Sequence, residues 1–297
     1  MDFFKEEMLK SHSVAYVTIG VCLVLILLLR NQLTDLALYE SSPVDWCGKS
    51  INKHDTMKHY IKFQSEINFE VHGGIAEFWN TVSSIPISLV APIAYRNEIV
   101  HQEVWQSFPN VVLVFALIVI IGIGSAYFHG TLSVTGQIMD EMSIFWLVSY
   151  SALVVVPPGK HTLIVDLAFQ KPVFVAFTLS TTLIGLFLPH LSHLIVLSCV
   201  PFGIYVHHQA FNRSKNATTK RRFNAGFVMF CLAWCCWLLD RFLCSYLKRM
   251  RSSLGFQPQL HAAWHILIGI TSYILFGVCI EFRREFSKRV SRLTGSV

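Results

Sequence analysis

Eight apolar runs follow one another along the chain, separated mostly by short polar segments. A helix needs about 20 apolar residues to span the hydrocarbon core of a bilayer, so runs of this length predict membrane-spanning helices. The fifth and sixth runs are separated only by Pro189, which predicts a tight helical hairpin. We expect the spans at residues 13–29, 75–95, 110–128, 137–156, 172–188, 190–208, 223–243 and 261–280.

Composition supports an all-α, polytopic membrane helix bundle. Hydrophobic residues make up 53% of the 297 residues and charged residues only 14%, whereas about 25% of the residues in a soluble domain are charged. The net charge of +6 is concentrated near residues 213–222 and in the C-terminal tail. No stripe of basic and aromatic residues favours nucleic-acid binding. The oligomeric state is left open by the sequence.

The chain divides into an N-terminal extension at residues 1–40, a membrane domain at 41–285 and a basic cytosolic tail at 286–297. The first run could be a cleaved signal peptide or a retained signal anchor, since Lys5, Lys10 and Arg30 flank it. We favour a retained span, because no clear small-residue cleavage site follows it. The chain would then carry one extra span at its N-terminus.

Orientation follows from the basic residues, which favour the cytosolic side of a membrane. A cytosolic tail places residues 213–222 in the cytosol as well, and residues 31–74 in the lumen. The loop at 243–260 becomes lumenal despite its Lys248, Arg249 and Arg251, which is a mild conflict. We expect a membrane of the endoplasmic reticulum or Golgi, with the C-terminus in the cytosol.

Two of the eight cysteines differ from the others in their expected position. Most cysteines lie inside spans, where they act as small apolar residues. Cys47 and Cys244 fall on or near the lumenal side, and an oxidising lumen permits a disulfide bond between them.

Three histidines lie at the lumenal ends of spans. His129 ends the third span, whereas His261 and His265 begin the eighth and share one helix face. An ionisable side chain at this depth costs free energy and therefore suggests a function. Three imidazoles leave a fourth zinc position for water, as in hydrolytic zinc sites. The alternative is three unrelated interfacial or core histidines, which would not be expected to converge at one depth.

Asp140 and Ser125 lie near the same end of the bundle. Asp140 is our candidate for the general base that takes a proton from water, or else it orients a histidine. Ser125 precedes His129 by one helical turn, so its hydroxyl could stabilise the oxyanion of a tetrahedral intermediate. Alternatively, Ser125 hydrogen-bonds only to its own helix. Asp240 is another expected buried carboxylate at this depth, with a role in hydrogen bonding or helix packing.

Six motifs in order resemble the alkaline ceramidase family, which belongs to a superfamily of seven-span membrane hydrolases that includes the adiponectin receptors. They cover residues 45 to the end and begin at Val44, Ile75, Ser125, Gln137, Trp237 and His261. The resemblance implies a seven-span core, zinc on His129, His261 and His265, and catalytic roles for Ser125 and Asp140. It also implies ceramide as the substrate, with sphingosine and a free fatty acid as products. The depth of the site suits such a lipid, because a long-chain amide can enter sideways from the bilayer.

The family also carries a calcium site, whose pattern is Asp-Trp-Cys-Glu-x-Asn followed by a glutamate in an Ala-Glu-Phe motif. Here Gly48 follows Cys47, and the missing residue types return at Glu66 and Asn68. We interpret residues 48–65 as an insertion that splits the calcium loop, either a retained intron, a gene-model error or a true loop. The resemblance then implies calcium on Asp45, Trp46, Glu66, Asn68 and Glu77; the alternative is an ordinary solvated loop.

Two other functions compete with a ceramide amidase. A receptor of the same superfamily would share the histidines, although the motifs at Asp45 and Ala76 favour the ceramidase branch. An ion or metal transporter would carry charged residues along a path through the bilayer, whereas here they gather at one end.

Overall fold

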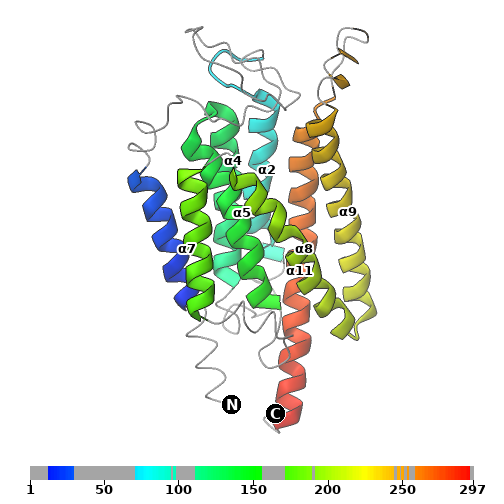
Figure 1. Cartoon of the computed structure of the whole chain (residues 1–297). Coiled ribbons are helices and arrows are strands. Elements are labelled where there is room, and N and C mark those ends of the chain that lie inside the picture. Colours follow the sequence, from blue (N-terminus) through cyan, green and yellow to red (C-terminus); the bar gives the residue numbers. More distant parts are fainter. Residues whose placement is uncertain are drawn as a thin grey trace.

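The protein is a bundle of helices that alternate in direction (Figure 1). The computed structural model describes residues 13–29, 71–94, 96–97, 111–155, 171–188, 191–243, 246–247, 249–250, 253 and 258–294. Within these ranges the long helices are an N-terminal helix, Ser13–Leu29, followed by α2 Phe78–Ala94, α4 Val111–Thr131, α5 Val134–Val155, α7 Lys171–Phe187, α8 Ser192–Arg213, α9 Ala217–Phe242 and α11 Leu260–Thr294. Each of the predicted spans coincides with one helix, which confirms the all-α class.

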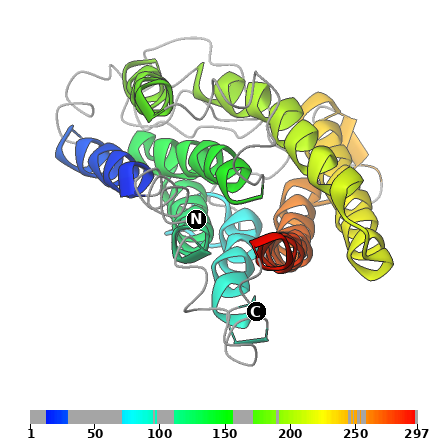
Figure 2. The ribbon, with the colours of Figure 1, turned by 90° about the horizontal axis from the view of Figure 1, so that it is seen from below.

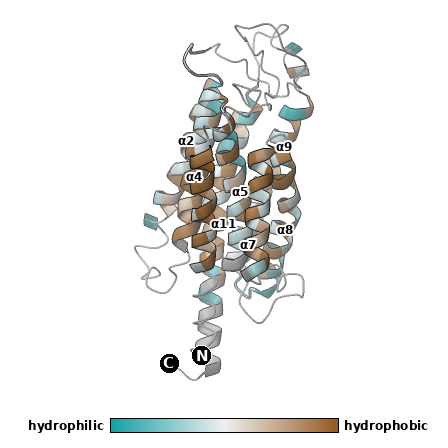
Figure 3. Cartoon of the chain, turned by 60° about the vertical axis from the view of Figure 1, so that its left-hand side comes forward, coloured by the Kyte–Doolittle hydropathy of each residue, from teal (hydrophilic) through white to brown (hydrophobic). Residues whose placement is uncertain are grey.

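Length and hydropathy support a membrane protein. Among the described residues, four helices are long and apolar enough to cross a bilayer, namely those at Val112–Thr131, Ser192–Arg213, Ala217–Phe242 and Leu260–Phe282. Apolar residues colour the middle of the bundle and polar residues its two ends (Figure 3). Many large apolar side chains point outward, such as Leu28, which is 67% exposed, and Phe242, which is 78% exposed. In water such a surface would promote aggregation, whereas lipid covers it without cost.

Among the helices that extend beyond their predicted apolar spans are α9 and α11, because capping and helix propensity determine where a helix ends. α9 begins at Ala217, not at residue 223, since the Asn216 side chain accepts hydrogen bonds from the backbone N–H groups of Thr218 and Thr219. α11 continues to Thr294, well past residue 280. No glycine or proline interrupts residues 278–294, and Gly295 follows the last turn.

Polar contacts join α11 to the start of α9 and to Ser214 just before it (Figure 1). Arg222 Nη1 lies 2.6 Å from Glu281 Oε1 in a partly buried ion pair. One turn further along α11, Glu285 Oε1 accepts a hydrogen bond of 2.7 Å from Ser214 Oγ. These contacts fix the α9–α11 pair at the end opposite the histidines.

The N-terminal helix packs one face onto the bundle. Its buried apolar positions are Ala15, Ile19, Cys22 and Ile26, which belong to the same apolar cluster as residues of α4, α5 and α7. Tyr16 contacts Tyr150 of α5 edge-on, with ring centroids 6.4 Å apart. Figure 2 shows this helix beside α4 and α5 at the outside of the bundle. The packing fits a helix that belongs to the folded domain, and its retention in the cell stays a prediction.

A sharp turn connects α4 to α5 at the histidine end. Leu132 has a φ of 52°, a left-handed conformation that is unfavourable for a leucine. Its side chain is buried with Ala76 and Phe128, which offsets this cost. The turn brings the last residues of α4 next to the first residues of α5, where two catalytic candidates lie.

Close helix contacts at two glycines position this turn. A Cβ atom on Gly136 would lie 2.8 Å from the Phe128 Cα atom, and one on Gly124 would lie 3.1 Å from the Asp140 backbone nitrogen. A side chain at position 136 would force the backbones apart, and one at position 124 would be tight, so these glycines allow α4 and α5 to approach closely. The approach sets the distance between Ser125 and Asp140.

Several predicted features lie outside the described residues. They are the calcium candidates Asp45, Trp46, Glu66 and Asn68, the insertion at residues 48–65, and the proposed disulfide between Cys47 and Cys244. Of the predicted calcium ligands, the structure describes Glu77.

Candidate active site

The three histidines converge at one end of the bundle. The ring of His129 lies 5.1 Å from that of His261 and 5.0 Å from that of His265, and the last two rings are 4.7 Å apart. All three side chains are buried. His129 comes from the end of α4 and the other two from the first turns of α11. The predicted grouping is therefore present in the structure.

Glu77 orients His129. Its carboxylate oxygen Oε2 lies 2.5 Å from His129 Nδ1, and both side chains are buried. The backbone N–H of Glu77 also donates to the His129 carbonyl over 2.9 Å, and the N–H of Ala76 donates to Gly130. A histidine that donates from Nδ1 to a carboxylate keeps Nε2 as its free acceptor. Glu77 therefore directs His129 Nε2 toward the other two histidines.

Two serines of α2 orient His265. Ser83 Oγ lies 2.8 Å and Ser84 Oγ 3.3 Å from His265 Nδ1. Both hydroxyls also donate to the carbonyl of Asn80. A hydroxyl with its single proton engaged can only accept from the ring, so we assign the proton to Nδ1 of His265. This leaves Nε2 of His265 facing the same point as Nε2 of His129.

The donor set fits a metal ion. One ligand atom from each histidine can be chosen so that all three lie within 4.8 Å of one another. His129 Nε2 is buried and has no hydrogen-bond partner among the described residues, which is unusual for a buried polar atom without a ligand. Imidazole nitrogens are preferred ligands of zinc and neighbouring transition metals. Three of them leave a position open for a reacting molecule.

Ser125 and Asp140 lie beside this group. Ser125 Oγ is 3.4 Å from His265 Nε2 and 3.1 Å from Ser84 Oγ. Ser125 also lies close enough to the Asp140 carboxylate to interact with it. The carboxylate oxygen Asp140 Oδ1 is buried and has no hydrogen-bond partner among the described residues. A proton acceptor and a hydroxyl are thus placed next to the histidines.

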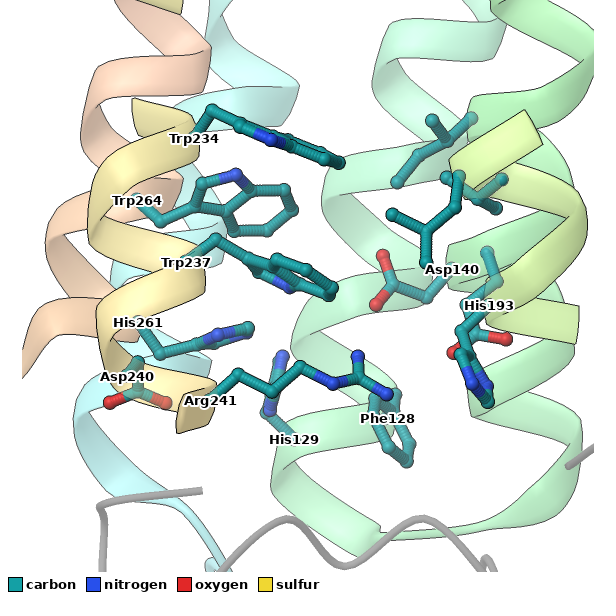
Figure 4. A pocket seen from close by; sticks show the side chains of 14 residues that line it. Phe128, His129, Asp140, His193, Trp234, Trp237, Asp240, Arg241, His261 and Trp264 are labelled. Carbon is teal, nitrogen blue, oxygen red and sulfur yellow. The ribbon is translucent and has the colours of Figure 1, made fainter. Parts of the chain in front are cut away.

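A cavity of about 80 Å³ connects these groups (Figure 4). His129, His261 and Asp140 contribute to its wall, together with three tryptophans and the charged residues Glu141, Asp240 and Arg241. Asp240, predicted from the sequence as a buried carboxylate at this depth, is only 1% exposed. The cavity has room for a small polar group, and its aromatic wall suits an apolar chain attached to that group.

The residues that orient the histidines were not predicted from the sequence. Glu77 was expected only as a calcium ligand, and no role was expected for Ser83, Ser84 or Arg241. The sequence does indicate that one face of α2 is polar, because Glu77, Asn80 and Ser84 recur on one helix face within an apolar run. Nothing in that pattern identifies a histidine on α11 as the partner.

Known proteins resemble this chain over most of its length. A family profile described as Ceramidase matches residues 38–292. Human alkaline ceramidase 1 is 29% identical over 241 residues, covering 78% of this chain and 80% of its own. Alkaline ceramidase of Drosophila melanogaster is 26% identical over 252 residues, with coverages of 82% and 78%. Alkaline ceramidase of Arabidopsis thaliana is 26% identical over 212 residues, with coverages of 70% and 78%.

The matched region and the folded core coincide. The profile begins after the N-terminal helix, Ser13–Leu29, and includes the helices from α2 to α11. It therefore contains the histidine group, Ser125, Asp140 and the cavity between them. The family match over most of the chain and the helical membrane bundle agree, and the chain belongs to the alkaline ceramidase family of hydrolases.

Proposed function

We propose that this protein is a zinc-dependent amidase that hydrolyses the N-acyl bond of ceramide to sphingosine and a free fatty acid. The observation that carries the proposal is the buried histidine group, with the Nδ1 atoms of His129 and His265 held by neighbouring side chains, beside the Ser125–Asp140 pair. The names of the similar proteins support ceramide as the substrate.

His129, His261 and His265 would hold the zinc ion through their ring nitrogens. When bound, zinc supplies an activated water molecule at neutral or alkaline pH. Glu77, Ser83 and Ser84 keep two of the rings in the orientation and tautomer that metal binding requires. These buried partners fix the site before the substrate arrives.

Asp140 is suited to move the proton. Its unpartnered carboxylate oxygen belongs to a residue that lines the cavity, where it can accept a proton from the attacking water. The water oxygen bonds to the carbonyl carbon, and the carbon–nitrogen bond then breaks as Asp140 delivers the proton to nitrogen. Ser125 is suited to donate a hydrogen bond to the carbonyl oxygen as it becomes negative.

Ceramide would reach this site from the bilayer. The cavity volume of about 80 Å³ accommodates the amide and its neighbouring hydroxyl groups but not two hydrocarbon chains. The chains must therefore extend between helices toward lipid. The apolar outer surface of the bundle is compatible with this entry.

Calcium binding and orientation also belong to the proposal. We propose a calcium site formed by Asp45, Trp46, Glu66, Asn68 and Glu77, together with a disulfide bond between Cys47 and Cys244. The basic C-terminal tail supports a cytosolic C-terminus, with the histidines toward the lumen of the endoplasmic reticulum or Golgi. The placement of Glu77 beside His129 would bring calcium close to the zinc site.

The experiment is the hydrolysis of a panel of ceramides by purified protein, with and without a zinc chelator. We expect equal amounts of sphingosine and fatty acid, loss of the reaction with chelator, and recovery when zinc is returned. His265→Ala should remove both bound zinc and activity, whereas His208→Ala, at an exposed position on α8, should remove neither. Full hydrolysis after complete removal of zinc, or none by the zinc-loaded protein, would contradict the proposal.

A further inference from the structure

Arg241 is a charged residue in the cavity that the proposed hydrolysis does not use. Of the described residues that line the cavity, it is the one with a permanent positive charge. Figure 4 shows its side chain reaching from α9 past His129 toward Phe128, below Asp140 in the view. An ionised group is costly in a partly buried, aromatic cavity, so its presence there calls for a partner or a ligand.

Contacts with Trp237 and Glu141 help to hold the Arg241 side chain in place. Its guanidinium carbon lies 4.7 Å from the centre of the Trp237 ring, a cation–π arrangement within the same helix. It is also close enough to Glu141 on α5 for their charges to attract each other. Arg241 therefore reaches from α9 toward α5 beside the reaction site.

A guanidinium group has more N–H donors than the single carboxylate of Glu141 can accept from. The Glu141 carboxylate already accepts from Ser192 Oγ and lies 3.4 Å from Gln137 Nε2. A guanidinium group has five N–H donors in a planar fork and can serve two carboxylates at once. The cavity thus contains a fixed donor group suited to a second carboxylate.

We infer that Arg241 binds the carboxylate of the long-chain fatty acid released by amide hydrolysis. The neutral amide of the substrate becomes an anion at the moment of cleavage, so only the product gains a charge-assisted hydrogen bond with Arg241. The identity of this ligand rests on the proposed function, and the binding itself can be measured without turnover. Arg241 then gives the site a higher affinity for the acid than for an uncharged lipid of equal length.

The test compares oleate with oleyl alcohol as ligands of the purified protein, with binding followed by tryptophan fluorescence. Trp234, Trp237 and Trp264 line the cavity and supply the signal. A bound metal would also attract a carboxylate, so the comparison is repeated with the metal removed by a chelator. In both states we expect oleate to bind about 10- to 100-fold more tightly than the alcohol, as for a hydrogen bond to a charged group.

Matched variants assign this preference to one residue. Arg241→Gln should abolish it, and Arg241→Lys should weaken it several-fold, because an ammonium group cannot form the two parallel hydrogen bonds of a guanidinium group. Arg221→Gln, the same change at an exposed position near the other end of α9, should leave it intact.

Three results would overturn the inference. The first is equal binding of oleate and oleyl alcohol by the wild type, and the second is a preference for oleate that is lost when only the metal is removed. The third is a preference for oleate that survives in Arg241→Gln. The wild-type comparison decides the first two even if a variant does not fold. If ceramide is not hydrolysed but oleate is still preferred through Arg241, the proposed function fails and this binding site stands.

Discussion

Glu77 and His129 are joined twice, by a side-chain contact of 2.5 Å between Oε2 and Nδ1 and by a backbone hydrogen bond of 2.9 Å. The two residues are far apart in the sequence, and the backbone contact fixes the start of α2 against the end of α4. Asn80 Nδ2 donates to the same carboxylate oxygen over 3.1 Å. The orientation of a histidine of the metal site thus depends on a residue that the sequence associates with calcium.

The first prediction follows from this contact. Glu77→Gln removes the charge that favours Nδ1–H on His129 while it keeps the shape of the side chain. We expect metal affinity to fall about 10- to 100-fold, as for other carboxylates that orient metal ligands. Competition with a chelator of known affinity measures the change. Glu281→Gln, which removes a carboxylate near the opposite end of the bundle, is the control, and equal affinities in the two variants would exclude the orienting role.

The role of Asp140 in hydrolysis should be separable from metal binding. Asp140→Asn cannot accept a proton, so we expect bound metal to be kept and most of the hydrolysis rate to be lost. Ser125→Ala should keep metal as well and reduce kcat by about 10²–10³-fold, the range found for a lost oxyanion donor. Metal content and kcat measured on the same preparations check both. Loss of metal in Asp140→Asn would show that this carboxylate supports the histidines instead.

A close contact between α2 and α4 should control stability. A Cβ atom on Gly122 would lie 2.4 Å from the backbone nitrogen of Ser88, and backbone cannot move aside as a flexible side chain can. We expect Gly122→Ala to destabilise the protein by about 1–3 kcal/mol or more. Gly20→Ala is the matched control, since no described atom lies within 4 Å of the position that its new methyl group would take. Thermal unfolding in detergent that leaves both variants equally stable would contradict the close contact.

The packing of the N-terminal helix can be tested with one residue on each face. Ile19 is 1% exposed, whereas Val24 is 53% exposed. Ile19→Ala should leave a cavity that costs about 2 kcal/mol or more, and Val24→Ala should cost little because lipid or detergent fills the space. Melting temperatures of the two variants provide the measurement. A harmless Ile19→Ala would mean that this helix adds nothing to the folded domain.

The positions of the helices and of the three histidines could be predicted from the sequence, because bilayer thickness and one-turn spacing act locally along the chain. His261 and His265 are one turn apart on any helix, and span alternation brings His129 to the same end. The partners of these histidines could not be predicted. Ser83 and Ser84 contact His265 only because α2 and α11 pack in one particular register, which depends on contacts between distant residues.

The charged residues in the wall of the cavity could not be predicted from the sequence either. Arg241 lies beside Asp240 at the end of a span, where a basic residue usually marks only the membrane boundary. In the packed bundle its guanidinium group lies over the Trp237 ring and is attracted by the charge of Glu141. Side-chain direction at a helix end is thus a property of the packed bundle and not of the local pattern.

The last prediction concerns the insertion at residues 48–65. Its deletion brings Cys47 directly before Glu66 and restores the family's calcium pattern up to Asn68. A contiguous loop has fewer conformations to lose on binding, although loop-closure entropy grows only with the logarithm of length. It also holds the carboxylates of Asp45 and Glu66 closer together before calcium arrives, and their repulsion is relieved only by a cation.

We therefore expect the deletion to tighten calcium binding and to raise the melting temperature only when calcium is present. The measurement compares the melting temperatures of the full-length and deleted proteins, each with calcium and with chelator. Glu77→Gln in the deleted protein should reduce the calcium-dependent shift if Glu77 binds calcium as well as orienting His129. Equal calcium-dependent shifts in the full-length and deleted proteins would show that the insertion leaves the site intact. A deleted protein that fails to fold would show that these residues are a structural part of the domain, against the interpretation of a split loop.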